Sequence, residues 1–243
     1  MFIRGLKNTQ QHKDYWTQRK IDWVSHYWNP DHPHRDFIIE ILKTSPPGSV
    51  CEIGCGAGAN LYRIKKEFTN CKIAGCDLNQ DAIDTANKLF FDANLPKAGT
   101  PDYSQHPKMK ELKGFLPDSF VKLPNLQDIE FKVGGIEVIP FHGESYDLIL
   151  TDACLLYVGP DKIFRALREI RRIGYKNMMF VELHHKSWFK RMALRLTRGY
   201  FAYDYEKLLK ENYFKSVKIT KIPPEIWPNE PWKTFGVIIT CGR

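Results

Sequence analysis

Three glycines and two carboxylates lie close together in the first third of the chain. Residues 50–60 read VCEIGCGAGAN, so Gly54, Gly56 and Gly58 follow a short apolar run. Glycines at this spacing let the backbone turn sharply and approach a ligand, and the helix expected next presents free N–H groups and the positive end of its dipole. The pattern predicts a small-molecule site at the start of that helix.

The acidic residues around this loop help to distinguish two kinds of cofactor. Gly54-x-Gly56-x-x-Ala59 also fits the loop with which nicotinamide enzymes hold pyrophosphate. Glu52, at the mouth of the loop, would repel pyrophosphate but suits a ligand that carries an ammonium and a sulfonium. Asp77 ends the next apolar run and can accept hydrogen bonds from a ribose diol of either cofactor. Glu52 therefore favours the sulfonium ligand, with NAD(P) as the alternative.

Apolar strands alternate with helices over most of the chain. The predicted strands are 49–54, 71–77, 129–134, 146–152, 176–182, 216–222 and 235–241, and the main helices are 60–68, 81–90, 160–173 and 203–213. Buried strands separated by helices indicate a parallel sheet with helices on both faces. The last two strands have no helix-length segment between them. We therefore expect an α/β, Rossmann-like, mostly parallel seven-stranded sheet with an antiparallel C-terminal hairpin.

The remaining segments suggest appendages to this sheet. Residues 1–47 are predicted to form a helical N-terminal lid or cap, and residues 48–243 the cofactor-binding domain. The Pro-, Lys- and Gly-rich insertion 95–127 is too long for an ordinary connection, so it is either a substrate lid or a surface insertion.

Composition is that of a soluble globular protein with a formal net charge of +8. The sequence has neither an apolar run of membrane-spanning length nor the apolar stretch of a signal peptide, and we expect a cytoplasmic protein without stable membrane insertion. The six cysteines match no zinc spacing, so buried free thiols and no metal site are predicted. The oligomeric state stays open.

The glycine loop and the order of elements resemble the class I S-adenosylmethionine-dependent methyltransferases of the small-molecule type, over residues 48–241. The resemblance implies that Glu52, Gly54, Cys55, Gly56 and Gly58 hold the methionine part of the cofactor, Asp77 the ribose and Leu78 the adenine. Residues 134–141 read GGIEVIPF, where Gly135 replaces the aspartate that usually meets adenine. The contact would then come from the backbone of Gly135 and Ile136. Thr151 and Asp152 would lie beside the amino-acid end and the methyl group.

Candidate catalytic side chains follow the predicted fifth strand. His184 is the expected general base, because its ordinary pKa lies near neutrality, although it could instead hydrogen-bond a loop. Glu182 could remove a proton or orient a substrate amine. Substrate contacts are expected from His34, Arg35, Tyr157 and His185, with a surface ion pair as the alternative role of Arg35.

Residues 187–198 predict a basic amphipathic helix. Arg191, Arg195 and Arg198 share one side, whereas Phe189, Met192 and Leu196 share another. Such a helix could pack its apolar side on the core, bind RNA phosphates or lie on an anionic membrane.

The favoured function is methyl transfer to O or N of a small polar metabolite. An RNA methyltransferase is the first alternative, because residues 160–221 carry 16 Lys and Arg against 6 Asp and Glu, so the net positive charge is concentrated there. A nicotinamide-dependent oxidoreductase is the second.

Overall fold

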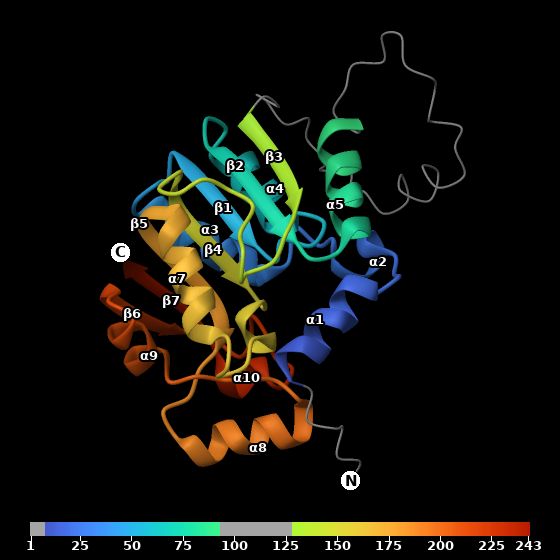
Figure 1. Cartoon of the computed structure of the whole chain (residues 1–243). Helices are drawn as coiled ribbons and strands as arrows, with labels where there is room; N and C mark the ends of the chain where they lie inside the picture. The colour runs from blue at the N-terminus through green and yellow to red at the C-terminus, as the bar shows by residue number, and fades with distance from the viewer. Residues whose placement is uncertain (1–7, 93–127) are drawn as a thin grey trace, which may run out of the picture.

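A seven-stranded sheet forms the centre of the molecule (Figure 1). The computed structural model describes residues 8–92 and 128–243. The strands are β1 (Ser49–Ile53), β2 (Lys72–Asp77), β3 (Ile129–Val133), β4 (Tyr146–Asp152), β5 (Gly174–Leu183), β6 (Lys215–Lys221) and β7 (Gly236–Gly242), in the spatial order β3-β2-β1-β4-β5-β7-β6. The predicted fold class is confirmed.

The order of the strands reverses beside β1. This strand pairs in parallel with β2 on one side and with β4 on the other, and the chain then extends outward in both directions to β3 and β5. In open parallel sheets, ligands bind beyond the carboxyl ends of the strands at such a reversal. The loops that follow β1, β2 and β4 begin there, next to one another.

Helices cover both faces of the sheet because successive side chains of each strand point to opposite sides. One buried layer contains Val50 and is covered by α3 (Pro33–Lys43), α4 (Ala59–Glu67) and α5 (Gln80–Asn87). The other layer contains Cys51 and is covered by α7 (Ile163–Ile173) and α9 (Tyr205–Glu211). α5 continues as a π-helical turn, η1 (Lys88–Asp92), and a short 3-10 helix, η4 (Leu155–Tyr157), follows β4.

The C-terminal part closes the sheet as predicted. β7 lies between β5 and β6 and runs antiparallel to both, and α10 (Trp232–Phe235) is a single turn before β7. α8 (Trp188–Arg198) lies apart from the sheet (Figure 1).

The first two helices lie over the carboxyl-end side of the sheet. α1 (Thr9–Gln18) and α2 (Trp23–Tyr27) contact η4 and α5 respectively, and the Trp23 ring would lie 3.6 Å from a Cβ built on Gly56. Trp23, Trp28 and Ile38 belong to the same buried cluster as the sheet residue Val50. The N-terminal helices therefore pack directly over the glycine loop.

Two expectations concern other parts of the chain. The predicted insertion 95–127 lies outside the described residues. No helix within residues 8–92 or 128–243 is long and apolar enough to cross a membrane.

Candidate methyl-donor and acceptor site

The glycine loop folds back onto the end of β2. Gly54, Gly56 and Gly58 all have positive φ, at 77°, 52° and 85°, a region that side chains disfavour. The Gly54 N–H donates to Cys76 O at 2.7 Å, and the Gly56 N–H donates to Asp77 Oδ2 at 2.9 Å. The loop after β1 is thereby fixed against the carboxylate that ends β2.

Close packing explains two of these glycines beyond their backbone angles. A Cβ on Gly54 would lie 2.8 Å from Cys154 Sγ, and one on Gly58 would lie 2.9 Å from the Phe90 ring. Cys55 is buried, with its sulfur over Gly75. The loop thus lies between η1 on one side and the end of β4 on the other.

Asp77, Leu78 and Gly135 come together at the ends of β2 and β3. The other Asp77 oxygen, Oδ1, accepts a hydrogen bond from the Asn79 N–H at 2.9 Å. Burial raises the pKa of Asp77, and its backbone hydrogen bonds oppose that shift. Leu78 Cδ2 would lie 2.6 Å from a Cβ on Gly135, so the Leu78 side chain lies directly against this glycine, and the neighbouring Ile136 is half-buried.

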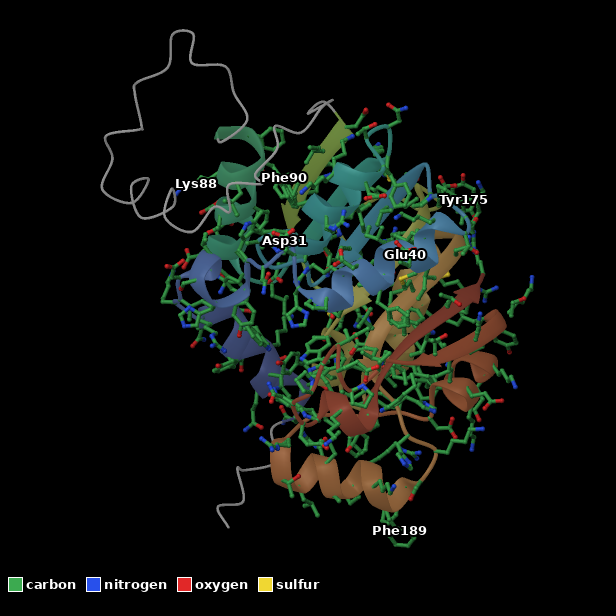
Figure 2. All side chains as sticks on the ribbon, turned by 180° about the vertical axis from the view of Figure 1, so that it is seen from behind. Asp31, Glu40, Lys88, Phe90, Tyr175 and Phe189 are labelled. Atoms are coloured by element: carbon green, nitrogen blue, oxygen red, sulfur yellow. The ribbon has the colours of Figure 1, made fainter. Side chains whose placement is uncertain are left out.

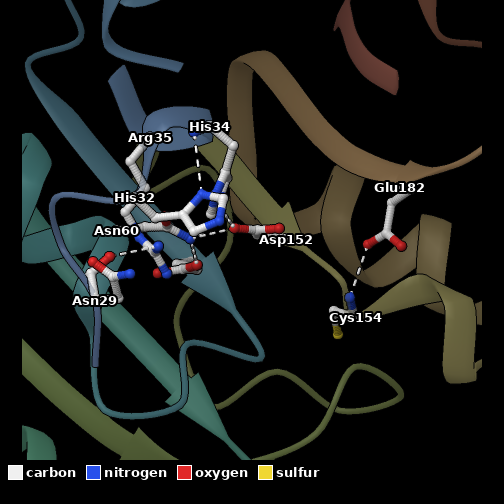
Figure 3. Close-up of polar contacts among 9 residues, drawn as sticks. Asn29, His32, His34, Arg35, Asn60, Asp152, Cys154 and Glu182 are labelled. Atoms are coloured by element: carbon white, nitrogen blue, oxygen red, sulfur yellow. Dashed lines mark hydrogen bonds and ion pairs between the residues drawn. The ribbon is translucent and has the colours of Figure 1, made fainter. Parts of the chain in front are cut away.

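A chain of polar contacts joins the first helices to the ends of β1 and β4 (Figure 3). Asn60 Nδ2 donates to Glu52 Oε1 at 2.6 Å and to Asp152 Oδ2 at 2.9 Å. Asp152 Oδ2 also lies 2.8 Å from His34 Nε2, and His34 Nδ1 lies 2.6 Å from His32 Nδ1. Glu52, Asn60 and His34 are buried. We call Glu52, Asn60, Asp152, His34 and His32 the polar cluster.

Hydrogen-bond directions indicate which member of the histidine pair carries charge. The His34 backbone N–H donates to His32 Nδ1 at 3.3 Å, so His32 Nδ1 is an acceptor. His34 must then donate to it from Nδ1 while Nε2 faces the Asp152 carboxylate, which places protons on both ring nitrogens. The contact between His34 and Asp152 is therefore an ion pair. Burial, followed by the nearby charge of His34, lowers the pKa of His32 to about 4 and leaves its ring neutral.

The two carboxyl groups of the cluster differ in their proton affinity. Burial raises the pKa of Glu52 to about 8, with the charge of Asp152 adding to the shift. Burial also acts to raise the pKa of Asp152, but the charges and hydrogen bonds of His34, with help from Arg35 and Asn60, outweigh it and hold the value below its usual range. At neutral pH the cluster therefore contains one carboxylate and one protonated carboxyl.

Four buried polar atoms at this place have no hydrogen-bond partner within the described part of the chain. They are Glu52 Oε2, Asn60 Oδ1, Asp152 Oδ1 and Arg35 Nε. Unsatisfied buried groups are costly and rare in native proteins. Three oxygens match the three N–H donors of an ammonium, and a guanidinium N–H matches a carboxylate. These residues fit the amino-acid end of S-adenosylmethionine.

Glu182 and Thr151 lie on the other side of the strand ends. Glu182 is fully buried and accepts a hydrogen bond from the backbone N–H of Cys154 at 3.0 Å (Figure 3). It also accepts from the backbone N–H groups of Leu155 and Leu156 at 2.8 and 3.1 Å and from Thr151 Oγ1 at 3.0 Å. Burial raises the pKa of Glu182, and the backbone donors oppose that shift. These contacts support the loop after β4.

The predicted histidines after β5 contact local backbone. His184 Nδ1 accepts from the Tyr205 N–H at 3.1 Å, at the start of α9, and burial lowers the pKa of His184. His185 Nδ1 accepts from the Ser187 N–H at 2.9 Å, just before α8, and burial likewise lowers its pKa. Neither residue is joined by a hydrogen bond to the polar cluster in the described residues.

Aromatic rings surround Tyr157 next to the cap. Its ring centroid lies 5.2 Å from Trp16, 5.3 Å from His12 and 5.6 Å from Tyr200. Arg35, in contrast, donates from Nη1 to Asn29 O at 2.7 Å. His34 and Arg35 thus lie at the polar cluster, and Tyr157 lies among aromatic rings.

Several side chains of this region were not predicted from the sequence. Asn60 bridges two carboxyl groups, His32 contacts His34, and Trp227 stacks on His34 with centroids 4.5 Å apart. Asn60 could have been found, because a polar residue in the first turn after the glycine loop falls on a face that must be buried. The chain offers no local signal for Trp227.

The cysteines and the possible metal ligands are the remaining reactive side chains. All six cysteines are free thiols, and five of them are buried. Among the described residues, no group of three or more histidine, cysteine or acidic side chains is arranged to hold a metal ion.

Comparison with known proteins identifies the family. Residues 51–180 match the family described as "Methyltransferase domain". This match covers more than half of the chain, so the chain belongs to that family. No curated protein matches the sequence.

Solved structures share the fold at low sequence identity. A proposed O-methyltransferase from Nostoc punctiforme is 14% identical with a TM-score of 0.61, and the match covers 91% of this chain but only 60% of that protein. Magnesium protoporphyrin IX methyltransferase from Synechocystis, with bound SAH, is 13% identical with a TM-score of 0.58, over 97% and 100% of the two chains. A SAM-dependent methyltransferase from Aquifex aeolicus is 11% identical with a TM-score of 0.57, over 92% and 99%. At these identities the likeness concerns the fold.

Family membership confirms the predicted class. The chain is a class I methyltransferase on a Rossmann-like sheet, an enzyme class whose methyl donor is S-adenosylmethionine. The nicotinamide-dependent oxidoreductase, which used the same glycines, is set aside.

Proposed function

We propose that this chain transfers a methyl group from S-adenosylmethionine to a nitrogen or oxygen of a small polar metabolite in the cytoplasm. The observation that carries the donor assignment is the set of unpartnered buried atoms on Glu52, Asn60, Asp152 and Arg35, directly beside the glycine loop. The six free thiols are consistent with a reducing compartment.

Each part of the donor has residues suited to it. The ammonium would bind the free oxygens of Glu52, Asn60 and Asp152, and the carboxylate the Arg35 guanidinium. Asp77 would accept from the ribose hydroxyls, and Leu78 with the backbone of Gly135 and Ile136 would border the adenine. The backbone of the loop Gly54–Gly58, with Cys55 packed beneath it, and the backbone of Thr151 would complete the site. These assignments follow the geometry reported above and await mutation.

The acceptor is proposed to bind between the cap and the strand ends. The rings around Tyr157 form an aromatic wall there, and aromatic faces favour a nearby cation such as a sulfonium. Residues 1–47 would act as the cap that excludes water from this space. A space bordered by aromatic rings and a few polar groups suits a small acceptor better than a polymer.

The acid–base roles divide among four residues. Because the Nδ1 of neutral His32 accepts from His34, its remaining ring proton lies on Nε2, and this N–H could donate a hydrogen bond to an oxygen of the acceptor and orient it. We propose Glu182 as a positioning residue for the loop after β4, since its carboxylate already accepts four hydrogen bonds. His184 and His185 keep the proposed roles of general base and substrate contact only if their contacts with the starts of α9 and α8 open.

Calorimetry with S-adenosylmethionine, its demethylated product and NADH tests the donor assignment. Wild type should bind the first two and not NADH. Asp77→Ala should weaken both by roughly 10- to 100-fold, as expected for losing hydrogen bonds to a charged group. Asp84→Ala, an exposed carboxylate on α5, is the matched control and should bind like wild type. Normal donor binding by Asp77→Ala would refute the ribose assignment.

The acceptor class needs a separate experiment. Release of the demethylated product should be measured with panels of small amines, hydroxyl compounds and carboxylates, and with structured RNA. Turnover with a small molecule, lost in His32→Ala but with donor affinity unchanged, is the expected result. Turnover with RNA alone would replace the small-metabolite proposal by the RNA alternative.

A further inference from the structure

α8 presents an apolar stripe to solvent. Trp188 is 56% exposed, Phe189 78%, Met192 38% and Leu196 43%, whereas Leu194 is the one buried residue of the helix. The arrangement in which Phe189, Met192 and Leu196 pack on the core is therefore excluded. Large contiguous apolar surfaces on a folded protein usually mark an interaction site.

The stripe follows from helix geometry. At about 100° per residue, positions 188, 189, 192 and 196 fall on one side of the helix and position 194 on the other. α8 is thus attached to the body by Leu194 and directs its aromatic and aliphatic side chains outward. In Figure 1 the helix lies at one end of the molecule, and in Figure 2 the Phe189 side chain points away from it.

Positive charge borders the stripe. Residues 186–198 contain Lys186, Lys190, Arg191, Arg195 and Arg198 and no acidic residue. Arg191 Nη1 donates to His185 O, and Arg195 Nη1 donates to Gly199 O with its guanidinium 3.8 Å over the Phe201 ring. These contacts fix the two guanidinium groups at the ends of the helix and leave their charge in place. Glu206 pairs with Lys186. Glu230 lines the groove of about 360 Å³ behind α8 together with Lys190 and Arg198, so this acid is accompanied by two of the cations and does not lie on the stripe.

We propose that α8 docks the protein reversibly on an anionic lipid bilayer, with Trp188, Phe189, Met192 and Leu196 entering the headgroup region. A short helix with an apolar side that includes Trp and Phe and with cations beside it matches the requirements of an interfacial anchor. A second copy of this chain fits less well, because two such helices would bring like charges together. RNA fits less well, because the outermost surface is apolar and the cations stand to its sides.

Docking through α8 would also orient the cap. Gly199, which ends α8, accepts through its carbonyl oxygen from Arg195 and lies 3.1 Å from His12 Nε2 of α1. The end of the anchor and the start of the cap therefore share one backbone oxygen. A bilayer held against α8 would lie next to the cap side of the molecule.

Vesicle flotation tests the proposal with the full chain. Wild type should float with vesicles of phosphatidylcholine and phosphatidylglycerol, bind pure phosphatidylcholine more weakly, and detach as salt is raised. Trp188→Ser with Phe189→Ser should weaken binding at least about tenfold, because two large apolar side chains would no longer leave water on docking. Lys190→Glu with Arg198→Glu should abolish the preference for anionic vesicles.

Matched control variants test whether any exposed aromatic ring or any exposed positive charge would have the same effect as those of α8. Phe164→Ser removes an exposed aromatic ring of α7, and Lys215→Glu with Lys218→Glu reverses two exposed charges of β6; both should float like wild type. Unchanged donor affinity and circular dichroism verify folding. The proposal is overturned if wild type does not float at low salt, if both α8 variants float normally, or if those variants instead abolish self-association or RNA binding.

Discussion

At the scale of single residues, one amide group determines the electrostatics of the donor site. Asn60 Nδ2 donates to both Glu52 and Asp152, which brings two carboxyl groups to neighbouring positions in a buried place. Two negative charges cannot persist there together without compensation. His34 compensates Asp152, so Glu52 is the group that takes up a proton.

Donor binding should therefore release a proton from Glu52. Its pKa of about 8 leaves it protonated at pH 7, and an arriving ammonium favours the ionised form, so affinity should increase as pH rises from about 6 to 7.5. Calorimetry in buffers of different ionisation enthalpy should detect release of about one proton per donor at pH 7. Glu52→Gln should abolish the release, and the exposed-site variant Glu40→Gln should retain it. Binding without any proton exchange in wild type would contradict the arrangement.

Glu182 should matter for stability through its hydrogen bonds. Glu182→Gln replaces one oxygen by an N–H donor that faces backbone N–H groups, and should lower the free energy of unfolding by about 2 kcal/mol or more. Thr151→Val removes a single donor and should cost about 1 kcal/mol. Urea denaturation of both variants measures the difference. Glu182→Gln with full stability and no turnover would instead support the direct catalytic role that the sequence suggested.

At the scale of secondary-structure elements, two glycines with a left-handed backbone differ in how much free energy a side chain at their position should cost. Gly58 begins α4 and Gly199 ends α8, and both have a left-handed backbone, at φ 85° and 76°. A Cβ on Gly58 would meet Phe90 of η1 at 2.9 Å, whereas one on Gly199 would have nothing within 4 Å. Alanine substitutions at these two glycines therefore separate the cost of backbone strain from the cost of a steric clash.

Gly199→Ala should cost only the backbone strain, on the order of 1–2 kcal/mol. Gly58→Ala should cost clearly more, because η1 must also move. Donor affinity should fall in Gly58→Ala and stay unchanged in Gly199→Ala. Thermal unfolding and calorimetry of the two variants check this, and equal destabilisation by both would show that η1 yields without cost.

The elements were predictable because their signals are local. Apolar runs located all seven strands, and the glycine loop indicated the place proposed for the donor, since both patterns are read within about ten residues. Glu52, Asp152 and His34 were named as candidates, but their contacts were not predictable, because His34 and Asp152 are 118 positions apart and Asn60 and Asp152 are 92 apart. The exposure of α8 was also hidden: an amphipathic pattern is the same whether the apolar side meets protein or solvent. Glu182 looked catalytic because a charged residue at a strand end is the usual signature of a site.

At the scale of the whole molecule, α1 and the turn after it are attached to the body by three groups of hydrogen bonds and by the exposed Lys20–Asp81 ion pair. Thr9 Oγ1 donates to Asp161 at 2.8 Å and accepts from the Gly159 N–H, and His12 contacts Gly199 O. The third attachment is Asn79, whose Nδ2 donates to Trp16 O at 2.7 Å and to Arg19 O at 2.8 Å. Asn79 also donates its backbone N–H to Asp77, so the third attachment and the proposed ribose site share one turn of chain.

Asn79→Asp should uncouple the cap while preserving α5. The carboxylate keeps the oxygen that caps α5 through the Ala82 N–H, but it replaces the two donated hydrogen bonds by repulsion from two carbonyl oxygens. We expect faster hydrogen exchange in α1 and α2, unchanged exchange in α5, and donor affinity reduced by roughly tenfold because Trp23 no longer covers the glycine loop. Asn79→Ser can still accept from the first turn of α5 but is too short to reach the carbonyl oxygens of Trp16 and Arg19. It should therefore give a smaller loss of donor affinity, with faster exchange in α1 and α2 as well. If exchange in α1 and α2 stayed at the wild-type rate in both variants, the attachments at Thr9 and His12 would suffice to hold the cap, and its coupling to the donor site would have to run through packing alone.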